Sequence, residues 1–112
     1  MNRSLEKIVT NWVTPESKVI DFGCGDGSLL KALISLKSIA GYGVENDPHK
    51  IQECIANGIS VIQQDIDQGL LEYKDMDFDM AIMASSIQCL RQPKEAMATI
   101  LEVASQCVIT LP

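Results

Sequence analysis

Positive charge is scarce in this chain. Nine lysines and arginines are set against fifteen aspartates and glutamates, which gives a formal net charge of −6 over 112 residues. Nucleic-acid backbones carry dense negative charge, and proteins that bind them present an excess of lysine and arginine. The charge balance therefore argues against nucleic acid as a partner.

Long apolar runs are also lacking. No stretch approaches the roughly 18 residues that a membrane-spanning helix needs, and the first residues show no signal-peptide pattern. The chain has one histidine and four cysteines, and no two cysteines are spaced C-x-x-C. Neither a metal site nor a disulfide framework is therefore indicated. We expect a cytoplasmic protein with reduced thiols, no membrane contact and no metal.

Aromatic residues make up 4% of the chain and hydrophobic residues 46%, so the core must come mainly from Ile, Leu, Val, Met and Ala. The length fits one domain, and Trp12 is expected to pack its helix onto a sheet. Strands that alternate with helices indicate an α/β fold with a parallel sheet. We predict strands at 19–22, 42–45, 59–63, 78–84 and 107–111, and helices at 4–14, 28–37, 48–57 and 93–104, with a helical turn at 69–73.

Two stretches, 19–27 and 41–47, have the pattern of a nucleoside site. The first reads as a buried strand that runs into a glycine-rich turn and then a helix, and the second as a strand that ends in an acid, Glu45. Glycines let a ligand approach the backbone closely, and a carboxylate at the next strand end can accept hydrogen bonds from two ribose hydroxyls. The alternative is a glycine-rich turn that holds no ligand.

The glycine spacing separates two classes of cofactor. A dinucleotide fingerprint has its third glycine five positions after the first, whereas here Gly27 follows Gly23 by four. Asp26 stands within the turn, where its charge repels a pyrophosphate, and a second acid, Asp21, closes the preceding strand. Two carboxylates around such a turn suit a ligand with an ammonium or sulfonium centre.

This pattern of acids and glycines closely resembles the S-adenosylmethionine (SAM) site of class I SAM-dependent methyltransferases. The resemblance implies a Rossmann-like methyltransferase fold with parallel strand order 3-2-1-4-5. It places Asp21 near the methionine amino group and Glu45 on the ribose. It also implies that Asp65 accepts a hydrogen bond from the adenine amino group and that Ile66 covers the ring. The cofactor-binding residues expected from it are Asp21, Gly23, Cys24, Gly25, Gly27, Glu45, Asn46, Asp65 and Ile66.

Longer strings resemble a narrower family, the methionine biosynthesis proteins called MetW. The strings are DFGCGDGSLL at 21–30, GYGVE at 41–45 and VIQQDIDQGL at 61–70, and the resemblance runs over nearly the whole chain. It implies a SAM-binding, methyltransferase-fold protein that supports or regulates a homoserine O-acyltransferase. The alternative is an active SAM-dependent methyltransferase that acts on an unidentified small molecule.

A catalytic residue is not indicated. The loop that faces the methyl group in this fold contains Ser85, Ser86, Gln88 and Cys89, without an acid–base pair. Class I methyltransferases continue past the fifth strand with a helix and two further strands. The resemblance therefore implies a single domain, 1–112, that is incomplete at its C-terminus and lacks the last two strands. An open edge on the fifth strand predicts self-association.

Overall fold

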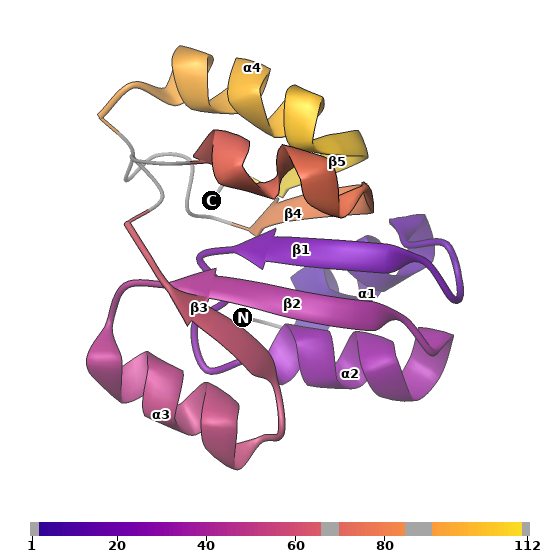
Figure 1. Cartoon of the computed structure of the whole chain (residues 1–112). Coiled ribbons are helices and arrows are strands. Elements are labelled where there is room, and N and C mark those ends of the chain that lie inside the picture. Colours follow the sequence, from indigo (N-terminus) through magenta and orange to yellow (C-terminus); the bar gives the residue numbers. More distant parts are fainter. Residues whose placement is uncertain (1–2, 66–69, 85–90, 111–112) are drawn as a thin grey trace.

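The computed structural model describes residues 3–65, 70–84 and 91–110 (Figure 1). Its strands are β1 (Lys18–Phe22), β2 (Ala40–Glu45), β3 (Ser60–Gln63), β4 (Phe78–Ala84) and β5 (Ala104–Thr110). They form one parallel sheet in the order β3-β2-β1-β4-β5. The predicted α/β architecture and strand order are confirmed.

Helices cover both faces of the sheet. The helices α1 (Arg3–Trp12), α2 (Ser28–Lys37) and α3 (Pro48–Ala56) lie against one face, and the 3-10 helix η1 (Leu70–Met76) and α4 (Pro93–Val103) lie against the other (Figure 1). Strand alternation divides the core in the same way. Val19 and Ile82 pack with the first group, and Ile20 and Met83 with the second. Both faces of the sheet are thereby buried, as is usual for parallel sheets.

The two helices beside the carboxyl edge of the sheet begin where their sequence predicts. Asp47 caps α3, because its Oδ1 accepts a hydrogen bond from the His49 N–H at 2.9 Å and Pro48 takes the first helical position. Helix α2 begins directly after Gly27, whose φ of 81° no β-branched residue adopts readily. The glycine turn and the start of α3 therefore lie at the edge where a ligand is expected.

The first helix buries only a narrow stripe of its described apolar residues. Val9 and Val13 are buried, but Trp12 is 68% exposed, so the prediction that Trp12 packs onto the sheet is wrong. Val9 and Val13 lie one turn apart and face the sheet. Trp12 is rotated by about 100° from Val13 and leaves the flank of the helix. Helix α4 likewise leaves two large apolar side chains, Met97 and Leu101, exposed.

Candidate functional site

The loop between β1 and α2 holds three glycines in the left-handed backbone region. Gly23, Gly25 and Gly27 have φ angles of 81°, 59° and 81°, which cost a residue with a Cβ about 1–2 kcal/mol. A Cβ built on Gly27 would lie 3.0 Å from Ile59 Cγ1, whereas a Cβ on Gly25 would meet nothing within 4 Å. Packing against Ile59 therefore requires a glycine at position 27. At Gly25 the backbone is not covered by a side chain, so a ligand could approach it.

Glu45, at the end of β2, joins this loop to the neighbouring strand. Its Oε1 accepts a hydrogen bond from the Gly25 N–H at 2.9 Å, and its Oε2 accepts from the Asn46 and Asp47 N–H groups, both at 3.0 Å. The carboxyl ends of β1 and β2 lie together at the left of Figure 1. The structure thus brings together the two stretches that the sequence singled out. Asn46 takes part through its backbone N–H.

Asp21 is a buried acid at the same edge. Its side chain is 2% exposed, and its Oδ1 has no hydrogen-bond partner among the described residues. Burial, and secondly the negative charge of Glu45, raises the pKa of Asp21 from its ordinary value of 3.8 to about 7. A buried polar atom without a partner is costly. A cation or a hydrogen-bond donor on a ligand would satisfy it.

Asp26 occupies the N-terminus of α2. Its Oδ1 accepts a hydrogen bond from the Ser28 N–H at 2.9 Å, and this bond holds the pKa of the Asp26 carboxyl below its usual range. Its carbonyl oxygen accepts a hydrogen bond from Asn57 Nδ2 at 3.1 Å, which ties the loop to the end of α3. A pyrophosphate needs free N–H groups at a helix N-terminus. Because an acid already uses this position, the loop disfavours a dinucleotide.

Two buried thiols, Cys24 and Cys54, contact each other and the backbone of the glycine loop. Cys24 Sγ and Cys54 Sγ lie 3.6 Å apart, and Cys54 Sγ donates a hydrogen bond to the Gly25 carbonyl oxygen at 3.0 Å. Burial raises the pKa of both thiols. A Cβ on Gly43 would lie 2.5 Å from Cys24 Sγ, so Gly43 makes room for that side chain. Sequence reasoning missed Cys54, whose signal was no more than an apolar position on α3.

The end of β3 lies at the same edge of the sheet. The Gln64 N–H donates a hydrogen bond to the Glu45 carbonyl oxygen at 3.0 Å, which places the next residue, Asp65, beside the end of β2. Asp65 Oδ2 lies 4.0 Å from Arg91 Nη2. The predicted residue Ile66 lies outside the described residues, as do Ser85, Ser86, Gln88 and Cys89.

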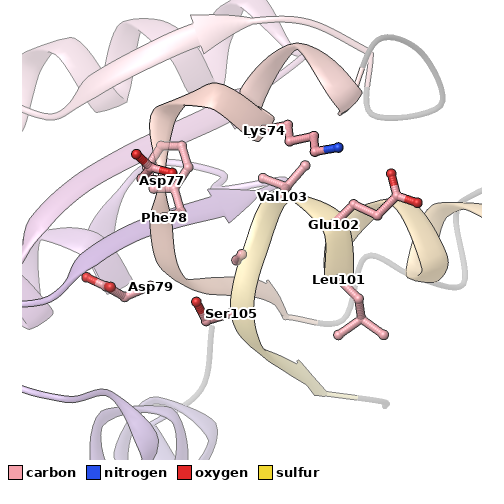
Figure 2. A pocket seen from close by; sticks show the side chains of 9 residues that line it. Lys74, Asp77, Phe78, Asp79, Leu101, Glu102, Val103 and Ser105 are labelled. Carbon is pink, nitrogen blue, oxygen red and sulfur yellow. The ribbon is translucent and has the colours of Figure 1, made fainter.

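A hollow lies at the opposite edge of the sheet, where β4 and β5 begin (Figure 2). Its volume is about 340 Å³. Its charged lining residues, Lys74, Asp77, Asp79 and Glu102, are all exposed. Asp79 Oδ2 accepts a hydrogen bond from the Lys18 N–H at 2.8 Å, so one of these acids secures the start of β1. The hollow has the character of a solvated groove, and the carboxyl edge is the candidate site.

Neither a metal cluster nor a membrane-spanning helix is present in residues 3–65, 70–84 and 91–110. In these ranges no three His, Cys, Asp or Glu residues lie close enough together to hold a metal ion. None of the helices described there has both the length and the apolar character needed to cross a bilayer.

Comparison with known proteins identifies the family. The family model for methionine biosynthesis protein MetW matches residues 3–112. The chain belongs to the MetW family. The bifunctional methionine biosynthesis protein MetXA/MetW of Rhodopirellula baltica is 28% identical over 115 residues, which cover 96% of this MetW-family chain and 18% of that relative. The ribosomal protein L11 methyltransferase of Xylella fastidiosa is 32% identical over 62 residues, which cover 52% of the chain and 20% of that protein. The matched residues thus span about a fifth of the length of each relative.

Solved structures share the fold of this MetW-family chain. A TehB-like SAM-dependent methyltransferase from Corynebacterium glutamicum matches with a TM-score of 0.77 and 20% identity, over 93% of this chain and 59% of its own. The plantazolicin methyltransferase BamL, in complex with SAH, matches with a TM-score of 0.74 and 20% identity, over 90% of this chain and 40% of its own. The [4+2]-cyclase SpnF matches with a TM-score of 0.77 and 20% identity, also over 90% and 40%. These likenesses confirm the Rossmann-like methyltransferase fold.

Proposed function

We propose that this chain binds S-adenosylmethionine at the carboxyl edge of β1, β2 and β3 and supports or regulates a homoserine O-acyltransferase of methionine biosynthesis. One observation carries the binding proposal. Asp21 is buried, its Oδ1 has no partner among the described residues, and it lies at the edge where Gly25 leaves bare backbone. SAM carries an ammonium and a sulfonium on an adenosine, so its positive groups suit this negative site.

Each acid has a separate task in this proposal. Glu45 already accepts three backbone hydrogen bonds, and a carboxylate has about four acceptor positions. It would therefore receive one ribose hydroxyl instead of the two expected from the sequence. Asp65 would accept a hydrogen bond from the adenine amino group, and Asp21 would face the methionine ammonium. Bound SAM supplies an electrophilic methyl group. The residues of this chain hold and orient the cofactor.

A pair of glycine variants tests the binding proposal. Gly25 and Gly58 have φ angles of 59° and 73°, and a Cβ on either would meet nothing within 4 Å. Gly25→Ala and Gly58→Ala should therefore each cost about 1–2 kcal/mol of stability through backbone strain. Gly58 follows α3, and its N–H donates to the Ile55 carbonyl oxygen at 3.0 Å, whereas the Gly25 N–H donates to Glu45 of the proposed site. We expect Gly25→Ala to weaken SAM binding in equilibrium dialysis at least tenfold and Gly58→Ala to leave it unchanged. Equal SAM affinity in the two variants would oppose the assigned site.

The pathway role is supported by the fused relative, in which MetXA and MetW are parts of one bifunctional protein. SAM is made from methionine, so a SAM-binding partner could report the end product to an earlier enzyme. The test is the activity of the homoserine acyltransferase from the same organism, measured with this chain, with SAM and with both. A SAM-dependent change supports the role. No complex and no change in rate would oppose it. The expected cytoplasmic location stays a prediction.

The alternative is an active SAM-dependent methyltransferase that acts on a small molecule, and the fold shared with the SAH-bound BamL favours it. Fold alone does not decide this, because SpnF has the same fold and is named a [4+2]-cyclase. Transfer of labelled methyl from SAM to metabolites of a cell extract tests it. Appearance of a labelled product with the wild-type chain and its loss in Gly25→Ala would favour this alternative.

A further inference from the structure

We propose that Tyr73 and Gln64 are a positioning pair that holds Asp65 in place for adenine recognition. This inference rests on the proposed SAM-binding function. The Tyr73 hydroxyl donates a hydrogen bond to Gln64 Oε1. Gln64 is also fixed through its backbone, because its N–H donates to the Glu45 carbonyl oxygen at 3.0 Å. The residue before Asp65 is therefore held at two points.

Tyr73 is itself rigidly placed. It is 4% exposed, and its ring meets the Phe22 ring edge to face, with 5.8 Å between centroids and 68° between planes. Phe22 is the last residue of β1, and Gly23 of the glycine loop follows it. A buried tyrosine hydroxyl needs a hydrogen-bond partner, and here the partner is the side chain next to Asp65. The core cluster that contains Phe22 and Tyr73 thus also holds the residue that follows β3.

The position of the Asp65 carboxylate should decide how well the site distinguishes adenine from hypoxanthine. An ionised carboxylate accepts hydrogen bonds and donates none. Adenine offers an amino group as donor at its C6 position, whereas hypoxanthine presents a carbonyl acceptor there. A well-placed Asp65 therefore favours adenine and rejects hypoxanthine. If the end of β3 is loosened, this discrimination should decrease more than the binding of the shared ribose and methionine parts.

The test compares two ligands, S-adenosylhomocysteine and its deaminated analogue S-inosylhomocysteine, in calorimetric titrations. Tyr73→Phe removes the hydroxyl and keeps the ring. Tyr42→Phe is the matched control, because Tyr42 also packs edge to face, on Phe78, with 5.6 Å between centroids. We expect Tyr73→Phe to reduce the preference for the adenine ligand about three- to tenfold, the equivalent of one hydrogen bond. Tyr42→Phe should leave the preference unchanged.

A second variant keeps the inference testable if Tyr73→Phe folds poorly. Gln64→Met removes the acceptor and keeps the side-chain length. It should reduce the same preference by a similar factor, and the double variant should lose no more than either single variant, because the two residues act through one contact. An equal loss of affinity for both ligands would mean a structural role alone and would overturn the inference.

The outcomes separate this inference from the proposed function. If the wild-type chain binds S-adenosylhomocysteine and Tyr73→Phe keeps the full preference for adenine, the positioning pair is wrong and SAM binding stands. If the wild-type chain binds neither ligand, both the proposed function and the pair are wrong.

Discussion

Replacing Asp21 by Asn should stabilise the free protein above neutral pH while weakening SAM binding. Asp21 is 2% exposed, and its Oδ1 has no partner among the described residues. Ionising it in the folded state is therefore unfavourable, and its pKa is raised to about 7. Asparagine has nearly the same shape and carries no charge at any pH, so it avoids this cost.

The magnitude follows from the two pKa values. A rise from 3.8 in an unfolded chain to about 7 in the folded protein corresponds to about 4 kcal/mol at 1.36 kcal/mol per pH unit. Between these values the folded state binds more protons than the unfolded state, so wild-type stability falls as pH rises. The cost is absent below about pH 4, grows up to about pH 7 and is fully present above that.

Urea unfolding of both proteins from pH 4 to pH 8 measures the effect. The gain of Asp21→Asn over wild type should increase by up to about 4 kcal/mol across this range and then level off. SAM affinity should rise through pH 7 in the wild type, because the ionised carboxyl attracts a cation, and should stay flat and lower in Asp21→Asn. A stability difference that does not change with pH would refute this reasoning.

Three further predictions concern the support of the site and the free edge of the sheet. Gly43→Ala places a Cβ 2.5 Å from Cys24 Sγ, so it should lower the free energy of unfolding in urea by about 1–3 kcal/mol. Adding Cys24→Ala should recover part of this loss. Full stability of the single variant would contradict the packing. Cys24 and Cys54 are buried and have raised pKa values. At pH 8 iodoacetamide should therefore label them far more slowly in the folded protein than in urea, as mapped by mass spectrometry. Fast labelling of the folded protein would oppose this. In the described part of the chain β5 pairs with β4 alone, so the 112-residue chain should self-associate with rising concentration in sedimentation, and a monomer at every concentration would argue against an open edge.

The sequence predicted those parts of the site that depend on neighbouring residues. The spacing of Gly23, Gly25 and Gly27 indicated a tight turn, and all three have positive φ. The helix predicted at 48–57 begins at Pro48, with Asp47 as its cap. Such features are set within a few positions along the chain, so local rules are sufficient for them.

Contacts between distant residues were not predictable in the same way. Cys54 reaches the Gly25 carbonyl oxygen from 29 positions along the chain, and nothing near Cys54 in the sequence indicates this. Trp12 lies three positions after the buried Val9, a spacing that suits one face of a helix. The sheet nevertheless covers only the part of α1 that carries Val9 and leaves Trp12 exposed. The boundary between α4 and β5 was also misplaced: Ala104, assigned to the helix, begins the strand, because an alanine fits both structures.

The proposed function requires an adenosine bearing a positive charge to bind at the glycine loop. The most direct measurement is a titration of the isotopically labelled chain with SAM, followed through backbone amide resonances. We predict saturable shifts of Gly23, Gly25 and Glu45, with no change at Lys74 or Ser105, which line the groove at the opposite edge of the sheet. An unchanged spectrum, or shifts confined to that groove, would contradict SAM binding at the glycine loop.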